Sequence, residues 1–213
     1  MKITVAPSIL AGNFADLRSS LIQIRESGAR WVHIDIMDGH FVPNLVFGPQ
    51  IVRALAVYKQ YLFFDVHLML EHPENFVEKF AEAGADLISI HVESRCNIEK
   101  TLQMIRILGK KVGLAINPET AIEKVFPYLD FVDLVLVMGV HPGFCGQKFI
   151  ESSLKKIETI RQKNLTIKIE IDGGVHLANA QLCIQKGADI LVAGTSFFKA
   201  PDPKKFVQQI EHE

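Results

Sequence analysis

The chain has 213 residues, of which 48% are hydrophobic, and its 23 basic and 24 acidic side chains leave a formal net charge of -1. This balance gives no basis for electrostatic binding of nucleic acid or of an anionic membrane. The three cysteines, Cys96, Cys145 and Cys183, are odd in number and form no CxxC pair, which favours a reduced intracellular protein over a disulfide framework. We expect one domain, residues 1–213, because about 200–250 residues often form a single α/β barrel.

The amino-terminal residues lack the apolar block and the cleavage site of a signal peptide. The longest apolar runs, such as Leu134–Met138, are shorter than the about 20 residues that a membrane-spanning helix needs. We therefore expect a soluble, cytoplasmic protein.

Eight short apolar runs recur along the chain, separated by longer amphipathic segments. The runs predict strands at Ile3–Ile9, Trp31–Met37, Phe63–Met69, Leu87–Val92, Val112–Ile116, Leu134–Val140, Ile167–Ile171 and Ile190–Ala193. Most are rich in β-branched residues and almost continuously apolar, as expected for strands buried on both faces of a parallel sheet. The intervening segments predict helices at Asp16–Ser27, Pro73–Ala83, Ile98–Leu108, Phe149–Gln162, Ala178–Lys186 and Pro203–Glu211.

Two intervening segments are less clear: one begins at Gly48-Pro49, and the other lies between Pro118 and Pro127. A glycine follows three of the predicted helices, at Gly28, Gly84 and Gly187, where a left-handed conformation can end a helix.

The eightfold alternation of strand and helix, without a linker, predicts the α/β class and a single-domain (β/α)8 TIM barrel. An open doubly wound sheet is the alternative, and the absence of a GxGxxG motif after the first strand weakens it.

The most informative motif is His33 and Asp35, two residues apart in an apolar run. Residues at i and i+2 of a strand share a face, so both side chains point the same way. His67 holds a similar position in the next run, and Asp172 ends a later one. In a barrel all four lie near the carboxyl ends of the strands, where active sites form.

The alternative for His67 is a hydrogen-bonded core histidine. A lone carboxylate at Asp35 is harder to explain, because burying it is costly without a partner or a metal. Taken together, the four residues predict a metal site and two proton carriers. Nitrogen and oxygen ligands without thiolate suit Zn²⁺, Fe²⁺, Mn²⁺ or Co²⁺. The other histidines have no comparable spacing, although His91 and His141 lie near the same end of the strands.

Glycine-rich turns follow three late strands, at residues 141–147, 172–174 and 193–196. Small residues let backbone N–H groups approach an anion, and loops after the last strands of a barrel often hold a phosphate. Their clustering favours a phosphate cradle over three unrelated tight turns. Methionines also gather at strand ends, where they are either core filler or an apolar cover over a reacting centre.

Several strings of the sequence together resemble the ribulose-phosphate 3-epimerase family. They are Ala6–Leu10, His33–Asn44, Asp65–Met69, Asn117–Thr120, Val137–Gln147, Asp172–Gly174 and Ala193–Ser196. The match runs nearly from end to end, and the stretch Met37–Asn44 is highly specific. The resemblance implies an isomerase of the pentose phosphate pathway that interconverts D-ribulose 5-phosphate and D-xylulose 5-phosphate on a (β/α)8 barrel with one divalent metal ion.

The resemblance also implies roles for individual residues. The metal ligands are His33, Asp35, His67 and Asp172, and the paired acid and base are Asp35 and Asp172. The substrate-binding residues are Ser8 and His67 and, on the phosphate side, Gly143, Phe144, Cys145, Gly146, Gly173, Gly174, Gly194 and Thr195. The methionine cap is Met37, Met69 and Met138. Because members of the family commonly form homo-oligomers, we expect one here.

Our hypothesis for the reaction is a 1,1-proton transfer at the carbon beside the ketone. One carboxylate removes the proton from one face, and the other carboxyl delivers a proton to the opposite face. The cis-enediolate formed in between needs stabilisation, which a divalent metal supplies as a Lewis acid. A phosphate anchor at the far end of the substrate orients it.

Three alternatives remain open. The first is the same chemistry on another ketose phosphate, such as D-allulose 6-phosphate. The second is a lyase of the related decarboxylase and hexulose-phosphate synthase type, but the third strand lacks the lysine of that Asp-x-Lys-x-x-Asp motif. The third is a non-catalytic barrel that binds a phosphosugar.

The chain departs from the family pattern in two places. His141 and Cys145 stand where the family usually has asparagine and glycine, and Gly12-Asn13 stands where it usually has alanine and aspartate. Asn13 can still cap the first helix. Cys145 adds a side chain where glycine permits close backbone approach or a positive φ, which leaves the loop conformation and the preferred sugar open.

Overall fold

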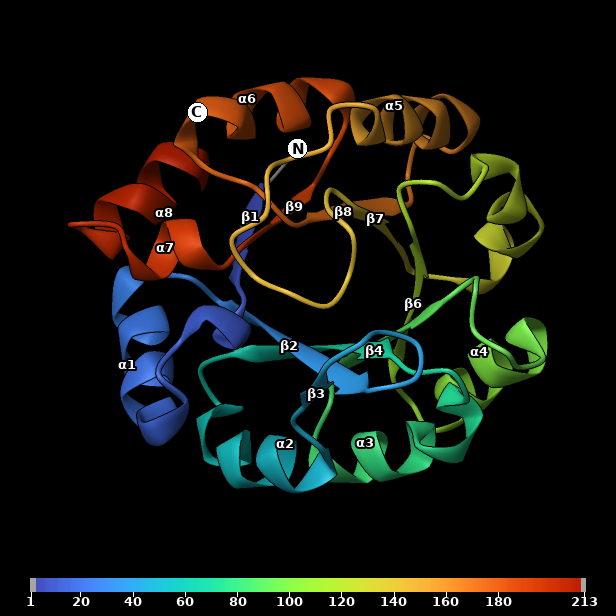
Figure 1. The fold of residues 1–213 in the computed structure, drawn as a ribbon, viewed down its shortest axis with the longest axis horizontal. Coiled ribbons are helices and arrows are strands. Elements are labelled where there is room, and N and C mark those ends of the chain that lie inside the picture. Colours follow the sequence, from blue (N-terminus) through green and yellow to red (C-terminus); the bar gives the residue numbers. More distant parts are fainter. Residues whose placement is uncertain (1–2, 212–213) are drawn as a thin grey trace.

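In the computed structural model, which describes residues 3–211, a parallel sheet curls into a barrel with helices around its outside (Figure 1). The strands are β1 (Thr4–Pro7), β2 (Trp31–Asp38), β3 (Leu45–Val46), β4 (Phe63–Met69), β5 (Leu87–His91), β6 (Lys111–Ile116), β7 (Leu134–Met138), β8 (Lys168–Asp172) and β9 (Ile190–Ala193). The helices are α1 (Leu17–Ser27), α2 (Pro49–Leu55), α3 (Val77–Ala83), α4 (Ile98–Ile107), α5 (Ser153–Lys163), α6 (Leu177–Lys186), α7 (Thr195–Phe198) and α8 (Pro203–Glu211).

The strand order is β1-β9-β8-β7-β6-β5-β4-β2-β3, with every neighbouring pair parallel except β2 and β3. The short hairpin strand β3 is absent from the sequence prediction, because two residues are too few to produce a period. The eight predicted strands all form, and the α/β barrel prediction is confirmed.

The seam between β1 and β2 closes the barrel through one bridge, which pairs Ser8 with His33. A longer ladder is blocked on the β1 side. The Val5 N–H donates to the Glu211 carboxylate of α8 at 2.9 Å, and Pro7 has no N–H to donate. The seam therefore meets at the two residues that lead into the candidate site.

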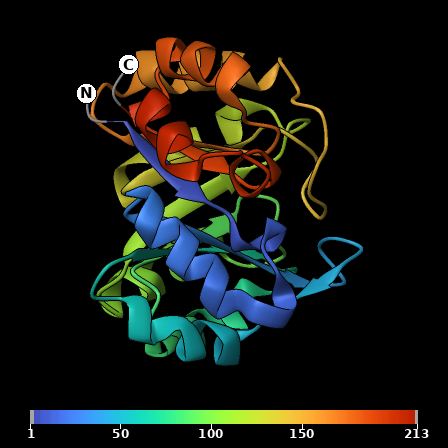
Figure 2. The same cartoon turned by 90° about the vertical axis from the view of Figure 1, so that its left-hand side faces the viewer.

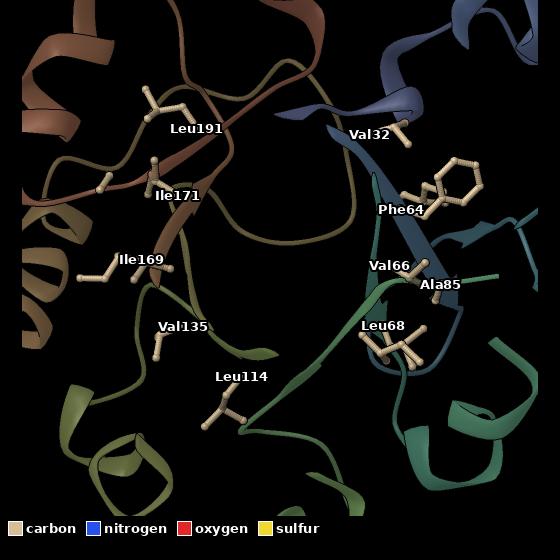
Figure 3. Packing of buried hydrophobic residues seen from close by; sticks show 14 of the residues in the cluster. Val32, Phe64, Val66, Leu68, Ala85, Leu114, Val135, Ile169, Ile171 and Leu191 are labelled. Atoms are coloured by element: carbon tan, nitrogen blue, oxygen red, sulfur yellow. The ribbon is translucent and has the colours of Figure 1, made fainter. Parts of the chain in front are cut away.

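Each strand has an outer face toward the helices and an inner face toward the barrel axis. The outer-facing side chains, among them Val32, Phe64, Val66 and Leu191, are fully buried and form one apolar cluster with the helices (Figure 3). The inner face holds a second apolar cluster, which includes Leu136, Met138 and Val192, and at its bottom Trp31 stacks on Phe63 with ring centroids 4.2 Å apart. The polar side chains of the interior come mainly from β2, β4 and β8, so one side of the barrel interior is polar and the other is apolar.

Most predicted helices form, with shifts at their ends. Gly28, Gly84 and Gly187 all adopt a left-handed conformation at helix ends, as predicted. The predicted helix at Pro73–Ala83 is wrong at its start, since Pro73–Asn75 is a 3-10 turn and α3 begins at Val77.

Three further differences concern the segments between strands. The predicted helix at Phe149–Gln162 begins only at Ser153, because the preceding residues pack across the barrel mouth and Ile150 N–H donates to Gly139 at 2.7 Å. The segment between Pro118 and Pro127 forms 3-10 turns at Ile122–Lys124 and Phe126–Phe131 instead of an α-helix. Asn13 caps a 3-10 turn at Phe14–Asp16, and Asp16 caps α1.

Three aspartates support the bottom of the barrel in the same way. Asp86, Asp133 and Asp189 each precede a strand, and each accepts the N–H of the second residue of an adjacent strand at 2.8–2.9 Å. Each also pairs with a basic side chain, from Lys59, Arg106 and Arg161 respectively. The repeated Gly-Ala-Asp string before β5 and β9 thus combines a helix stop with a strand anchor.

The loops at the carboxyl ends of the strands lie at one end of the barrel, and the start of β1 and the end of α8 lie toward the other (Figure 2). In Figure 1 the loop after β7 runs across the barrel opening. Within residues 3–211 no helix has the length and apolar character needed to cross a membrane.

We predict that Asp189→Ala destabilises the protein by about 3 kcal/mol, because it removes the carboxylate partner of the partly buried Arg161, 2.6 Å away, and leaves the Ile169 N–H without its acceptor. Urea unfolding measures the change. Asp130→Ala, at an exposed position on a 3-10 turn, serves as the control and should alter the free energy of unfolding by less than about 0.5 kcal/mol. Equal effects of the two substitutions would contradict the anchoring role.

Candidate active site and metal centre

The candidate site lies where β2, β4 and β8 end at the mouth of the barrel. The β2–β4 register pairs His33 with Asp65 and Asp35 with His67, and all four side chains occupy the inner face. Asp172 enters from β8, beside Met138 of β7. Three strands thus bring together residues that are up to 139 positions apart, counted from His33 to Asp172.

The four predicted ligand residues form one compact cluster. His33 Nε2 lies 3.3 Å from Asp35 Oδ1 and 3.8 Å from Asp172 Oδ2. His67 Nδ1 lies 3.2 Å and 3.9 Å from the same two oxygens. One donor atom from each residue lies within 4.8 Å of all the others, which is a spacing that can hold a metal ion.

The donor atoms of this cluster fit a metal. His33 Nε2 is buried and has no hydrogen-bond partner, and it faces the two carboxylates. The other ring nitrogen of His33, Nδ1, lies 2.6 Å from Asp65 Oδ2, so a proton on Nδ1 leaves the Nε2 lone pair directed into the cluster. Two imidazole nitrogens and two carboxylate oxygens suit a divalent transition metal.

A second acidic pair, Asp65 and Glu170, lies one layer deeper in the barrel and was missed by sequence reasoning. Both residues have no exposed surface, and Glu170 Oε1 lies 3.5 Å from His33 Nδ1. The signal was present, because Asp65 and Glu170 each precede a predicted site residue by two positions and therefore share its face. Burial and the Asp65 carboxylate hold the pKa of Glu170 well above its usual value.

His91 and Glu93 were also missed. His91 Nε2 lies 2.8 Å from His67 Nε2, and His91 Nδ1 lies 3.1 Å from Glu93 Oε2. Glu93 Oε1 accepts the N–H of Asn117 at 2.9 Å. In the sequence, His91 lies near the end of the predicted strand Leu87–Val92 and Glu93 stands two positions after it, so the i, i+2 spacing was the signal that could have found the pair.

The two carboxyl groups of the cluster have opposite pKa shifts. Burial opposes ionisation of Asp35, but His33 and His67 outweigh it and hold the pKa of Asp35 below its usual value. Burial and the Asp35 carboxylate raise the pKa of Asp172 to about 7. One group that favours its charged form beside one that favours its neutral form is the arrangement needed for a base and an acid at one site.

The histidines differ in charge preference as well. Burial lowers the pKa of His33, but the nearby Asp65 and Asp35 carboxylates reverse this and raise it well above its usual value. Burial lowers the pKa of His67 and brings that of His91 to about 4. His67 and His91 therefore favour the neutral imidazole, which is the form that can bind a metal.

Ser8 lies across the seam from His33 and is buried. Its hydroxyl donates to Asp35 Oδ2 at 2.6 Å, while Asp35 Oδ1 faces the two histidines. Because both oxygens of Asp35 are engaged, its carboxylate orientation is set from two sides.

A cavity of about 300 Å³ opens from this cluster toward solvent. Its lining includes Ser8, Asp35, Met37, Met69, Met138, Gly143, Phe144, Cys145, Gly146, Asp172, Gly173, Gly174, Gly194 and Thr195. Thus every predicted substrate, acid–base and methionine position borders the cavity except His67. Both His33 and His67 lie behind the lining with no exposed surface.

On the cavity rim, glycine can be required both by the backbone conformation and by the lack of space for a side chain. Gly173 has φ +103°, and a Cβ there would lie 2.3 Å from Val140 Cγ2. Cys145 is not in the left-handed region, since Phe47 is the one non-glycine residue with positive φ in the described chain. The side chain at position 145 therefore requires no left-handed backbone. Burial and the two site carboxylates, Asp35 and Asp172, raise the pKa of the Cys145 thiol to about 12, so it stays protonated at neutral pH.

Comparisons with known proteins agree with this geometry. Residues 4–198 match the model of the Ribulose-phosphate 3 epimerase family. The ribulose-phosphate 3-epimerase of Bacillus subtilis is 43% identical over 213 residues, covering 98% of each chain. The chloroplastic ribulose-5-phosphate-3-epimerase of Arabidopsis thaliana is 45% identical, over 98% of this chain and 76% of that one. The structure of 3-hexulose-6-phosphate synthase from Salmonella typhimurium has a TM-score of 0.73 at 15% identity, covering 100% and 97% of the two chains, and shows the shared fold.

The loop over the cavity is held by few contacts. The Gln147 side chain donates to the carbonyls of His141 and Phe144 at 2.7 and 2.9 Å. We predict that Gln147→Ala, which removes two bonds of about 1 kcal/mol each, speeds chymotrypsin cleavage after the exposed Phe144 by about tenfold or more. Limited proteolysis with mass spectrometry measures the rate.

The control is Gln103→Ala, which removes one exposed bond to Glu99 on α4. It should leave cleavage after Phe144 at the wild-type rate. If Gln147→Ala also leaves that rate unchanged, the two carbonyl contacts do not hold the loop.

Proposed function

Because this chain belongs to the ribulose-phosphate 3-epimerase family, we propose that Asp35 and Asp172 are the paired acid and base that invert carbon 3 of D-ribulose 5-phosphate to give D-xylulose 5-phosphate. The activity is that of an isomerase of the pentose phosphate pathway. The observation that carries the proposal is the pair of carboxyl groups beside one cavity, with pKa values shifted in opposite directions.

The proton on carbon 3 is acidic only because the adjacent ketone can take up the charge. One carboxylate takes this proton from one face of the substrate, and the electron pair moves into a cis-enediolate. The other carboxyl group donates its own proton to carbon 3 from the opposite face. Configuration is inverted because the two groups enter from different strands, Asp35 from β2 and Asp172 from β8.

We propose that His33, Asp35, His67 and Asp172 hold one divalent cation, Zn²⁺, Fe²⁺, Mn²⁺ or Co²⁺. When bound, such a cation supplies Lewis-acid stabilisation for the negative charge that develops on the substrate oxygens. Ser8 contributes by holding one oxygen of Asp35, and it also borders the cavity, where a substrate hydroxyl can reach it. The role of His67 as a direct substrate contact stays a prediction.

The phosphate is proposed to bind at the glycine-rich rim formed by Gly143, Phe144, Cys145, Gly146, Gly173, Gly174, Gly194 and Thr195. These residues border one cavity, and small side chains there leave backbone N–H groups accessible to an anion. Met37, Met69 and Met138 border the same cavity beside the carboxyl groups, and we propose that they cover the reacting carbon and exclude water.

The second candidate is 3-epimerisation of another ketose phosphate, such as D-allulose 6-phosphate, and the reason to consider it is that Cys145, a departure from the family pattern, lies on the cavity wall. A lyase activity has no support from the relatives, which are named as epimerases. A homo-oligomeric state and a cytoplasmic location stay predictions.

We predict that metal-replete enzyme in D₂O forms xylulose 5-phosphate carrying deuterium at carbon 3, because the incoming proton derives from a carboxyl group that exchanges with solvent. Asp35→Asn and Asp172→Asn should each lower kcat by about 10²-fold or more. Nuclear magnetic resonance of the product measures both formation and labelling.

The matched control is Asp130→Asn, the same chemical change on the surface, which should keep wild-type turnover. Near-normal activity in either site variant would refute the two-carboxylate scheme. Faster turnover of ketohexose 6-phosphates than of ribulose 5-phosphate would favour the second candidate, and binding without deuterium uptake would indicate a non-catalytic barrel.

We predict that chelator-treated protein takes up one equivalent of Co²⁺. At a free concentration one hundred times Kd, the ion should add about 2.7 kcal/mol to the free energy of unfolding, since it binds only the folded chain. Equilibrium dialysis and denaturant unfolding measure the two quantities. His67→Ala should abolish both effects, whereas His72→Ala, at an exposed position, should retain them. Wild-type protein that takes up no metal would refute the proposed centre.

A further inference from the structure

His91 and Glu93 have no part in the proposed chemistry, yet they are joined to His67 by a buried chain of polar contacts. His67 Nδ1 faces the ligand cluster, and His67 Nε2 faces away from it, 2.8 Å from His91 Nε2. His91 Nδ1 lies 3.1 Å from Glu93 Oε2. His67 and His91 have no exposed surface, so water does not substitute for the contact between their two rings, and the Glu93 side chain is 17% exposed.

The protons along this chain have one consistent order when Glu93 is ionised. A carboxylate only accepts, so His91 must carry its proton on Nδ1. The neutral His91 ring then has a lone pair on Nε2, and it must accept a proton from His67 Nε2. His67 is left with a lone pair on Nδ1, the atom that faces Asp35, Asp172 and the proposed metal.

A competing order exists, and it would disable His67 as a ligand. If His67 carried its proton on Nδ1, it would donate to Asp35 Oδ1 at 3.2 Å, and the proton would occupy the metal-binding lone pair. His91 would then donate from Nε2 to His67 and present a lone pair to the Glu93 carboxylate, which is repulsive. The tautomer of His67 therefore depends on which carboxylate accepts a proton from its neighbouring histidine, Asp35 from His67 or Glu93 from His91.

The surroundings fix Glu93 and His91 in place. Glu93 Oε1 accepts the N–H of Asn117, and the Asn117 carbonyl accepts Lys156 Nζ of α5 at 2.9 Å. The ring of Phe41 packs against His91 with centroids 4.7 Å apart. Both residues of the chain are thus held from the helix side and from the β2–β3 loop.

We propose that His91 and Glu93 are positioning residues, which form a hydrogen-bonded relay that keeps the His67 proton on Nε2 and so presents His67 Nδ1 as a metal ligand. The inference extends the proposed metal centre and rests on it for its purpose, but the tautomer itself is a property of the protein alone. His33 is oriented in a similar way but presents its other nitrogen. Asp65 accepts the proton on His33 Nδ1, which leaves the Nε2 lone pair available to a metal.

The first test reads the tautomer without metal or substrate. Two-bond ¹H–¹⁵N correlation spectra of the full, chelator-treated chain should show the His67 proton on Nε2 and the His91 proton on Nδ1. In Glu93→Gln, an amide replaces the carboxylate that directs the order, and a measurable share of His67 should shift its proton to Nδ1. A wild-type His67 protonated on Nδ1, or a Glu93→Gln spectrum with unchanged tautomers, would overturn the relay.

The second test uses Co²⁺ as the probe. His91→Leu removes the acceptor of the His67 proton and should weaken Co²⁺ affinity by about 10–100-fold and alter the visible spectrum of the Co²⁺ protein. His91→Gln offers an amide oxygen near the position of Nε2 and should restore the affinity to within about threefold of the wild type. Circular dichroism of each variant shows whether it is folded.

The two proposals fail in distinguishable ways. If wild-type protein binds no Co²⁺ but His67 carries its proton on Nε2, the metal centre fails and the relay stands. If wild-type protein binds Co²⁺ and epimerises the substrate, while Glu93→Gln and His91→Leu match its tautomers and affinity, the relay fails and the epimerase function stands.

Discussion

The parallel pairing of β2 with β4 sets the geometry on which the rest of the site depends. In this register His33 lies beside Asp65 and Asp35 beside His67, so that each imidazole has a carboxylate on the neighbouring strand. A shift of β4 by one residue would turn Asp65 and His67 toward the helices and place Val66 and Leu68 inside the barrel. The apolar outer face therefore does more than stabilise the fold. It holds the register, and the register assembles the site.

The barrel interior confines four carboxyl groups, of Asp35, Asp65, Glu170 and Asp172, with little or no access to water. Burial of unpaired charge is costly, so such a group must be neutral or lie beside a cation. His33 contacts all four and is the group that most reduces their repulsion. A divalent cation held by His33, Asp35, His67 and Asp172 would add further positive charge beside these carboxyl groups. The fold and the chemistry therefore share one electrostatic requirement.

The strands and the cluster of His33, Asp35, His67 and Asp172 could be predicted because each depends on the pattern of side chains within a single strand. The barrel followed from the repeated order of strands and helices. The ends of helices were less predictable, since the start of α5 at Ser153 follows from packing of the preceding loop across the barrel mouth. Asp65 and Glu170 stayed hidden because the same i, i+2 rule was applied only toward strand ends. The contact of His91 with His67 depends on how neighbouring strands align, which no single strand encodes. The conformation at Cys145 could not be predicted either, because the usual glycine of the family left open a positive φ that the backbone does not adopt.

Residues of the candidate site also help to close the barrel at the seam between β1 and β2. Between β1 and β2 the described chain forms one bridge, Ser8 to His33, and the same two residues border Asp35. Every other pair of adjacent strands is joined along a ladder of several residues or, for β2 and β3, two. A ligand that contacts Ser8 and Asp35 would therefore bridge β1 and β2 beside the pair of neighbouring strands that has the fewest paired residues in the described sheet.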